Sequence, residues 1–281
     1  MVDTAADQAS VASPAKRQGG LGLSSKTIER IMPWAVVISL FLVWELAVRI
    51  FDFPQFILPA PSVIFESMWQ WRVPIIDNAA QTAMTTVVGI GNAIVIGLET
   101  GYHVGSYSLI YNGFYPVLIG FNSIPKVAVV PILVIWFGIG TVPAIITAFL
   151  ISFFPILVNV ATGIATVEQE LKDVLRALGA SNRDIIVKVG IPRSLPYFFA
   201  SLKIAITVAF VGSIIAETVA SNKGIGHLMI QASSRFEVPL VFAGLLVTAI
   251  MGVVMYVVAT FVERRMTGWA TRSMDGSMGS S

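Results

Sequence analysis

Side chains that could carry out chemistry are few in this chain and form no recognisable catalytic or metal-binding pattern. The 281 residues include no cysteine, and the two histidines, His103 and His227, lie far apart in the sequence. The sequence has no Gly-x-x-x-x-Gly-Lys-Ser/Thr motif for nucleotide phosphates, so any step driven by ATP would need a partner that hydrolyses it. We therefore expect no catalytic residue, no metal site and no cofactor in this chain.

The composition indicates an integral membrane protein. Hydrophobic residues make up 56% of the chain and charged residues 12%, whereas a soluble domain has roughly 25% charged residues. The net charge of +2 is too small to indicate a nucleic-acid partner. Membrane lipid is the expected surrounding.

Four ionisable residues fall within or at the ends of apolar stretches: Glu45, Glu99, Lys126 and Glu217. A charge in mid-span costs about 2.5 to 3.5 kcal/mol on insertion scales, so each side chain should face protein, water or an opposite charge. Lys126 lies between Pro125 and Pro131, and a lysine on such a kinked helix could attract an anionic substrate. These three residues are candidates for a translocation path. The simpler interpretation is that Lys126 lies near the inner surface and extends its amine toward water.

The longest charged insert between apolar segments runs over residues 168–196. Its charged side chains exclude it from lipid, and its apolar residues recur with the spacing of one helix face. These apolar residues are Leu171, Val174, Leu175 and Leu178, whereas Asp173 and Arg176 point elsewhere.

A glycine turn and a second short helix follow this face. Gly179 and Ala180 come directly after the apolar face, and Ser181 with Asp184 has the spacing of a capping box. The second helix should stop before Pro192. Two short helices around a glycine turn, apolar on one side and charged on the other, are typical of a docking element, although a surface loop resting on its own protein would have the same pattern.

The row Asp173-Val174-Leu175, three residues, Gly179, nine residues, Val189-Gly190-Ile191-Pro192 resembles the Glu-Ala-Ala loop of ABC importer permeases. Gly179 and Pro192 match that pattern at the right spacing, whereas Asp173 replaces Glu and Val174 and Leu175 replace the two alanines. The resemblance implies that residues 168–196 contain a cytoplasmic coupling helix that enters a cleft of an ATP-binding subunit.

The spans that position this insert follow from the apolar stretches, because about twenty apolar residues cross a bilayer. The roughly fifty apolar residues from Phe114 to Ile164 are too long for one crossing, and Gly138, Gly140 and Pro143 mark the expected break. The predicted spans are 31–50, 79–101, two within 114–164, 197–216 and 239–262. They form a transmembrane domain over 31–265, between a cytoplasmic tail over 1–30 and a disordered tail over 266–281.

The predicted loops differ in charge and composition. Residues 51–78, 102–113 and 217–237 are the predicted connections, and the first of them is rich in proline and tryptophan. Lysines and arginines concentrate in the tails and the 168–196 insert, which favours an orientation with both termini and the insert in the cytoplasm. In the second span, Gly89, Gly91 and Gly97 predict a face suited to close helix contact.

Further segments resemble the nitrate, sulfonate and taurine branch of these permeases. They are residues 56–62, 124–131, 136–140 and 153–159. The resemblance implies an all-α type I ABC importer permease fold with six transmembrane helices and the coupling helix between spans four and five. It also implies a homodimer in the bacterial inner membrane. The expected partners are two ATP-binding subunits that hold ATP and Mg, and a periplasmic or lipoprotein substrate-binding protein.

The substrate implied by this branch is a small anion such as nitrate, a sulfonate or taurine, and similar permeases import vitamin precursors or aromatic acids. An ion-coupled secondary transporter is the alternative from another class. Such a transporter would need ionisable groups near the midplane and usually an internal repeat, and a membrane-embedded enzyme would need a catalytic constellation.

Overall fold

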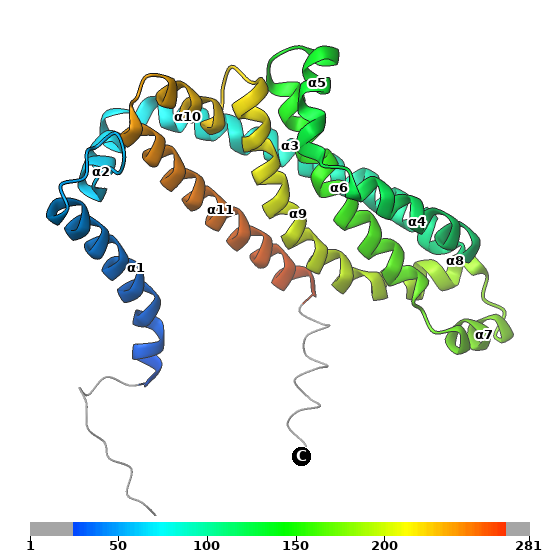
Figure 1. The fold of residues 1–281 in the computed structure, drawn as a ribbon. Helices are drawn as coiled ribbons and strands as arrows, with labels where there is room; N and C mark the ends of the chain where they lie inside the picture. Colours follow the sequence, from blue (N-terminus) through cyan, green and yellow to red (C-terminus); the bar gives the residue numbers. More distant parts are fainter. Residues whose placement is uncertain (1–24, 268–281) are drawn as a thin grey trace, which may run out of the picture. The chain divides into compact units, whose positions relative to one another are not determined.

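The computed structural model describes residues 25–267, and helices are the only regular elements in that range (Figure 1). The α-helices are α1 (Ser25–Ile50), α2 (Pro61–Gln70), α3 (Arg72–Ser106), α4 (Ser108–Ser123), α5 (Val130–Phe137), α6 (Thr141–Ala165), α7 (Gln169–Ala177), α8 (Asn182–Ile185), α9 (Ile191–Ala220), α10 (Ile225–Ser234) and α11 (Val238–Thr267). A 3-10 helix, η1 (Lys126–Val129), and a π-helix, η2 (Ile186–Gly190), complete the set.

Five described segments are long and apolar enough to cross a membrane: Ile31–Ile50, Arg72–Ser106, Thr141–Ala165, Asn182–Ala220 and Val238–Arg265. A sixth span results if the bent pair Leu109–Ser123 and Lys126–Phe137 counts as one crossing. These two pieces meet at an angle of 74°. The break lies at Ile124 and Pro125, where a proline disfavours helical backbone in the residue before it.

The chain divides between Ala47 and Val48 into two compact units. The first unit contains most of α1, whose large apolar side chains are exposed along the helix, as with Trp34 and Leu40. Helix α1 begins at Ser25, so the last residues of the predicted 1–30 tail are helical. At the other end, α11 continues to Thr267, two residues into the predicted 266–281 tail. The rest of both predicted tails lies outside the described residues.

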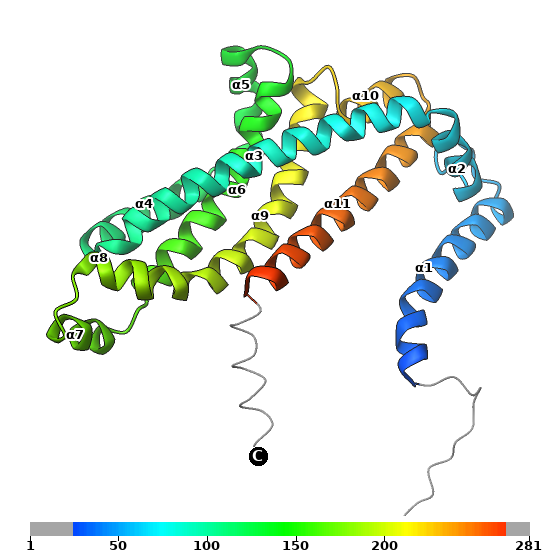
Figure 2. The ribbon, with the colours of Figure 1, turned by 180° about the vertical axis from the view of Figure 1, so that it is seen from behind.

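The core of the second unit is formed by α3, α6 and α9, which pack along one another (Figures 1 and 2). Small residues permit this close approach: a Cβ added at Gly89 would lie 2.6 Å from the Cβ of Ala148, and one added at Gly97 would lie 2.9 Å from Ile156. Gly101 meets Val160 in the same way. Within this chain the predicted contact at Gly91 is absent. Gly91 lies two residues from Gly89, on another side of the helix, and no atom of the described residues lies within 4 Å of an added Cβ.

The predicted break between the third and fourth apolar segments is confirmed. Gly138 and Gly140 have φ angles of 77° and 154°, values that favour glycine. Helix α6 begins directly afterwards at Thr141, and the Gly140 N–H donates a 2.8 Å hydrogen bond to the carbonyl oxygen of Ala220 at the end of α9.

Several predicted loops contain more helix than expected. Helix α3 begins at Arg72, inside the predicted 51–78 connection, because Pro74 falls in the first turn, where a backbone N–H is not needed. It also continues into the predicted 102–113 turn as far as Ser106, and α4 begins at Ser108, so that this turn is largely helical. The predicted 217–237 loop contains the end of α9 and the whole of α10.

Candidate docking site

The charged insert forms two helices joined at Gly179, as its sequence predicts. Helix α7 ends at Ala177, and Gly179 has a φ of 86°, a left-handed conformation that closes a helix without a Cβ penalty. The Gly179 N–H donates to the Arg176 carbonyl at 2.9 Å, and the Ala180 N–H donates to the Leu175 carbonyl at 3.0 Å. The end of α7 is therefore fixed by backbone hydrogen bonds rather than left as a slack loop.

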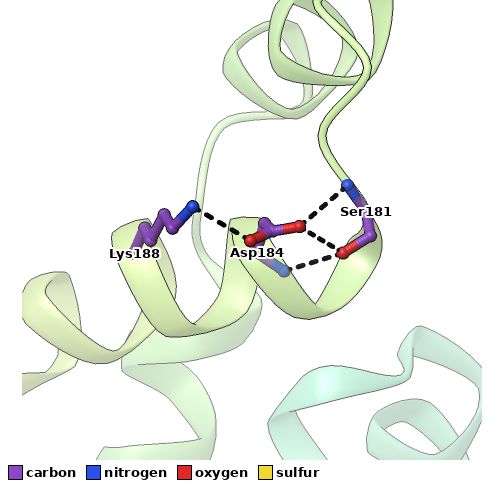
Figure 3. Close-up of polar contacts among 3 residues, drawn as sticks. All are labelled: Ser181, Asp184 and Lys188. Atoms are coloured by element: carbon purple, nitrogen blue, oxygen red, sulfur yellow. Dashed lines mark hydrogen bonds and ion pairs between the residues drawn. The ribbon is translucent and has the colours of Figure 1, made fainter.

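The predicted capping box at the start of α8 is also present (Figure 3). The Asp184 N–H donates to Ser181 Oγ at 3.2 Å, and the Ser181 N–H donates to Asp184 Oδ2 at 3.3 Å. The Ser181 hydroxyl adds a 2.5 Å hydrogen bond to the same carboxylate oxygen, and Lys188 Nζ lies 3.0 Å from Asp184 Oδ1. The hydrogen bonds from Ser181 and from Lys188 lower the pKa of this exposed carboxyl to about 2.

Arg176 connects the two short helices. Its guanidinium lies 3.0 Å from Asp173 Oδ1 on α7 and donates to the side-chain oxygen of Asn182 on α8 at 3.1 Å. At the base of the insert, Arg193 lies 3.5 Å from Glu168. Both ion pairs are exposed, and such pairs each contribute about 0 to 1 kcal/mol. They orient the segment more than they stabilise it.

The predicted apolar face of α7 divides into two parts. Leu171 and Leu175 are half-buried, whereas Val174 is 57% exposed and Leu178 is 78% exposed. Leu178 also borders a cavity of about 340 Å³ formed with Leu175, Ala180 and residues of α8 and η2. One part of the face thus packs on the chain itself, and the other is available to a partner.

The predicted stop before Pro192 is wrong. The chain passes from α8 through the π-helix η2 into α9 without leaving helical conformation. Pro192 stands in the first turn of α9, a helix position at which proline is tolerated. The π-helical turn before it does not use the regular i to i−4 hydrogen bonds that a proline would interrupt. The docking segment is consequently continuous with α9.

The candidate path residues lie at the break between α4 and α5. Pro125 precedes η1 and Pro131 occupies the first turn of α5. Lys126 is half-buried, and its amine donates to the backbone carbonyl and, at 2.6 Å, to the side-chain oxygen of Asn122. The amine also lies 5.8 Å from the ring centre of Phe154 on α6. In this arrangement Lys126 is bound to the end of α4.

A buried polar cluster lies near the end of α9, around Glu217. The sequence predicts that this side chain faces protein, water or an opposite charge, and the structure shows that it faces protein. Its carboxylate is 1% exposed and accepts hydrogen bonds from Thr82 at 2.8 Å, Thr85 at 3.2 Å and the Gly226 N–H at 3.2 Å. A Ser213 hydroxyl lies 2.5 Å from that of Thr85.

This cluster, which we call the Glu217 cluster, also fixes the loop before α10. The Gly224 N–H donates to the side-chain oxygen of Asn78 at 2.7 Å, and the Ile225 N–H donates to Thr82 Oγ1 at 2.9 Å. A Cβ at Gly224 would collide with the Glu217 carboxylate. The cluster therefore joins α3, α9 and the start of α10. Among the described residues, no group of three His, Asp or Glu side chains could hold a metal ion.

Comparison with known proteins gives one family and several relatives. Residues 89–268 match the family described as the binding-protein-dependent transport system inner membrane component. The chain is 31% identical to a riboflavin transport system permease protein, RibX, of Chloroflexus aurantiacus, over 83% of this chain and 88% of the relative. It is 24% identical to the formylaminopyrimidine transport permease ThiX of Halalkalibacterium halodurans, over 87% of this chain and 98% of the relative.

A shorter match covers 67% of this chain and 67% of a putative aliphatic sulfonates transport permease, SsuC, of Bacillus subtilis, at 28% identity. Among solved structures, an inward-facing MetNI methionine ABC transporter chain has the same fold. Its TM-score is 0.57 at 21% identity, over 70% of this chain and 96% of that chain.

Proposed function

The chain belongs to the family of binding-protein-dependent transport system inner membrane components, and from this premise we propose that α7 and α8 dock the permease onto its ATP-binding subunit. As an ABC importer permease, the chain is a transport component and not an enzyme, because ATP is hydrolysed in a separate subunit. The family also implies a substrate-binding protein as a partner.

One observation carries the docking proposal: Val174 on α7 and Leu178 directly after it present exposed apolar side chains beside the turn at Gly179. Apolar side chains on an otherwise charged surface segment favour a protein contact. A helix that inserts into a cleft would bury both. The cavity of about 340 Å³ beside Leu178 offers space for a side chain of the partner.

The same geometry supports a mechanism. Because α8 continues through η2 into α9, a movement of the docked segment is passed to a helix that packs along α6. Closure of the ATP-binding subunits would move α7 and α8, and α9 would change its position relative to α6 and α3. In this way ATP binding would switch the path between inward-open and outward-open states.

We also propose a homodimer in the bacterial inner membrane, with both termini and α7 in the cytoplasm and two ATP-binding subunits. The exposed apolar side chains of α5 support an intermolecular contact. Ile135 is 81% exposed and Trp136 is 70% exposed. Lipid would cover the same surface in a monomer, so the dimer is tested by measuring the mass of the detergent-purified permease. The mass of a monomer would contradict the proposal.

For the substrate, we propose a small anion such as nitrate, a sulfonate or taurine, and the similarity to SsuC supports it. A second candidate is a vitamin or vitamin precursor, which is favoured by the longer matches to RibX and ThiX. Uptake into vesicles that contain the complete transporter, with its binding protein added outside, separates the two. Labelled taurine taken up at the expense of ATP supports the first, and labelled riboflavin supports the second.

The docking proposal is tested by co-purification. The permease and the ATP-binding subunit of its transport system are co-expressed, and the complex is purified through a tag on the permease. We expect Leu178→Asp to lose most of the bound ATP-binding subunit, because a carboxylate would be buried in an apolar contact. Phe236→Asp is the matched control, since Phe236 is 81% exposed but lies after α10, remote in the chain from α7. Equal recovery from both variants would refute the docking site.

A further inference from the structure

A second cavity lies beside the docking segment and has a different character. It has a volume of about 570 Å³ and is bordered by the end of α3, the start of α4, the end of α6, and α7 and α8. Polar and aromatic side chains line much of it. They include Tyr107, Tyr111, Asn112, Lys172, Arg176 and Asn182.

The charge of this cavity is one-sided. Lys172 and Arg176 line it, and none of its lining residues is acidic within the part of the chain that the structure describes. Lys172 is half-buried. Arg176 is held by Asp173 at 3.0 Å and by Asn182 at 3.1 Å, which orients its guanidinium and leaves further N–H donors for a ligand. Two basic side chains, of which Arg176 is held in place, line the cavity without a carboxylate among its lining residues, a composition that suits an anion.

Hydrogen-bond donors and an apolar rim complete the site. Side-chain amides of Asn112 and Asn182 and the hydroxyls of Tyr107 and Tyr111 can donate to oxygen atoms of an anion. Tyr107 is 58% exposed and Leu109, at the rim, is 87% exposed. Exposed tyrosine and leucine beside paired basic residues are typical of the boundary between the bilayer and water.

We propose that this cavity binds a phosphate-bearing anion, either the headgroup of an anionic lipid or soluble phosphate. A guanidinium and an ammonium with several neutral donors suit the three or four oxygens of a phosphate group. The volume would also hold part of a glycerol headgroup. Bound there, the phosphate would connect α7 with the start of α4, so the ligand would stiffen the docking segment. The assignment of α7 as a docking segment rests on the proposed function, whereas the cavity and its charge do not.

Binding to the purified permease is the test, because it requires neither transport nor an ATP-binding subunit. The protein is purified in maltoside detergent, and its adducts with phosphatidylglycerol and with phosphatidylcholine are titrated by native mass spectrometry. Equilibrium dialysis with labelled inorganic phosphate forms the second arm. We expect tighter binding of phosphatidylglycerol than of phosphatidylcholine, or saturable binding of phosphate, and the arm that responds identifies the source.

The variants Lys172→Gln and Arg176→Gln assign the binding to this cavity. Each should weaken it about fivefold, and the double variant about 25-fold, since one basic residue near an anionic headgroup contributes about a factor of five. Arg183→Gln is the charge-matched control, because Arg183 lies on α8, is exposed and does not line the cavity. Lys172→Arg, which keeps the charge, should retain binding and shows that the site still folds.

The proposal is overturned if phosphatidylglycerol binds no more tightly than phosphatidylcholine and phosphate shows no saturable binding. It is also overturned if Arg183→Gln weakens binding as much as Lys172→Gln does. Failure of the docking proposal gives a different result. Leu178→Asp and Phe236→Asp would then recover equal amounts of the ATP-binding subunit, while anion binding would be unchanged. The two results can therefore be told apart in the same preparations.

Discussion

Removal of the buried Glu217 side chain is expected to destabilise the permease more than removal of an exposed carboxylate such as that of Glu99. In the variant Glu217→Ala, the hydroxyls of Thr82 and Thr85 and the Gly226 N–H lose an acceptor that they contact at 2.8, 3.2 and 3.2 Å. Thr82 can donate instead to the carbonyl oxygen of Asn78, at 3.1 Å, and Thr85 to the carbonyl oxygen of Thr82, at 3.0 Å. The Gly226 N–H is affected most.

The magnitude follows from what these bonds contribute inside a membrane. An unsatisfied buried donor costs about 1 to 3 kcal/mol in soluble proteins, but interhelical hydrogen bonds in a bilayer average about 0.6 kcal/mol, because the unfolded state in the membrane also finds partners. Three bonds at the membrane value give about 2 kcal/mol, and the empty space left by the side chain adds to it. For a chain of this size we expect a fall in Tm of about 4 to 8 °C.

The variant Glu217→Gln keeps the volume of the side chain, so it distinguishes the effect of lost hydrogen bonds from the effect of the empty space. A glutamine keeps the side-chain length and one carbonyl oxygen, which can still accept from Thr82 and the Gly226 N–H, since both contact the same carboxylate oxygen. The amide group would then face the hydroxyls of Thr85 and Ser213, which can accept hydrogen bonds. The loss in Tm should be less than half of that for Glu217→Ala.

The assay is thermal unfolding of the purified permease in detergent, followed by the fraction that remains monodisperse after heating. Glu99→Ala serves as the control, because Glu99 lies on α3 and is exposed. Hydrogen exchange at residues 221–226 provides a local readout, since this loop is held by the cluster. The reasoning is refuted if Glu217→Ala unfolds at the temperature of the wild type, or if Glu99→Ala is equally affected.

Three further predictions concern the core and the docking segment. Gly89→Val should lower stability by about 1 to 3 kcal/mol through overpacking against α6, whereas Gly91→Val, with open space around it, should leave the Tm unchanged. Gly179→Ala should strain the turn by about 1 to 2 kcal/mol, because residue 179 has a positive φ, whereas Gly179→Asn should be tolerated better. Hydrogen exchange of the α7 amides would detect the difference. The pKa of Asp184 is lowered on folding. The stabilisation of the folded state by this carboxylate is therefore full above its unfolded-state pKa near 4, and it is lost as the pH falls through about 2. Pepsin cleavage within residues 181–190 should therefore stay slower than in Asp184→Asn at pH 4 and approach it near pH 2.

The parts of the docking segment that the sequence predicted are those determined by local chemistry. A capping box requires residues three positions apart, and the Ser181 and Asp184 side chains meet without help from distant elements. The same holds for Gly179, whose position after a helix favours a left-handed backbone. The break at Gly138 and Gly140 was predictable for this reason as well.

Features that depend on three-dimensional neighbours were predicted less well. The spacing of Val174 and Leu178 placed them on one face with Leu171 and Leu175, but it could not show which of the four pack on the chain and which are exposed. Pro192 is a similar case, because a proline favours a helix start as well as a helix stop. The π-helix before it, which made a start possible, has no sequence signal of its own.

The Glu217 cluster shows how far the cost of a buried charge can guide a prediction. That cost predicted that Glu217 faces protein, water or an opposite charge. A search for an opposite charge would have failed, because the partners are hydroxyl and backbone groups of α3 and α10. Thr82 lies 135 residues away in the sequence. One available signal was the set of Thr82, Thr85 and Thr86 at helical spacing in an otherwise apolar stretch, since a polar stripe on one face of a span must face protein rather than lipid. Pairing that stripe with the one acidic residue of α9 would have located the cluster, and the arrangement of α3 beside α9 would have followed from it.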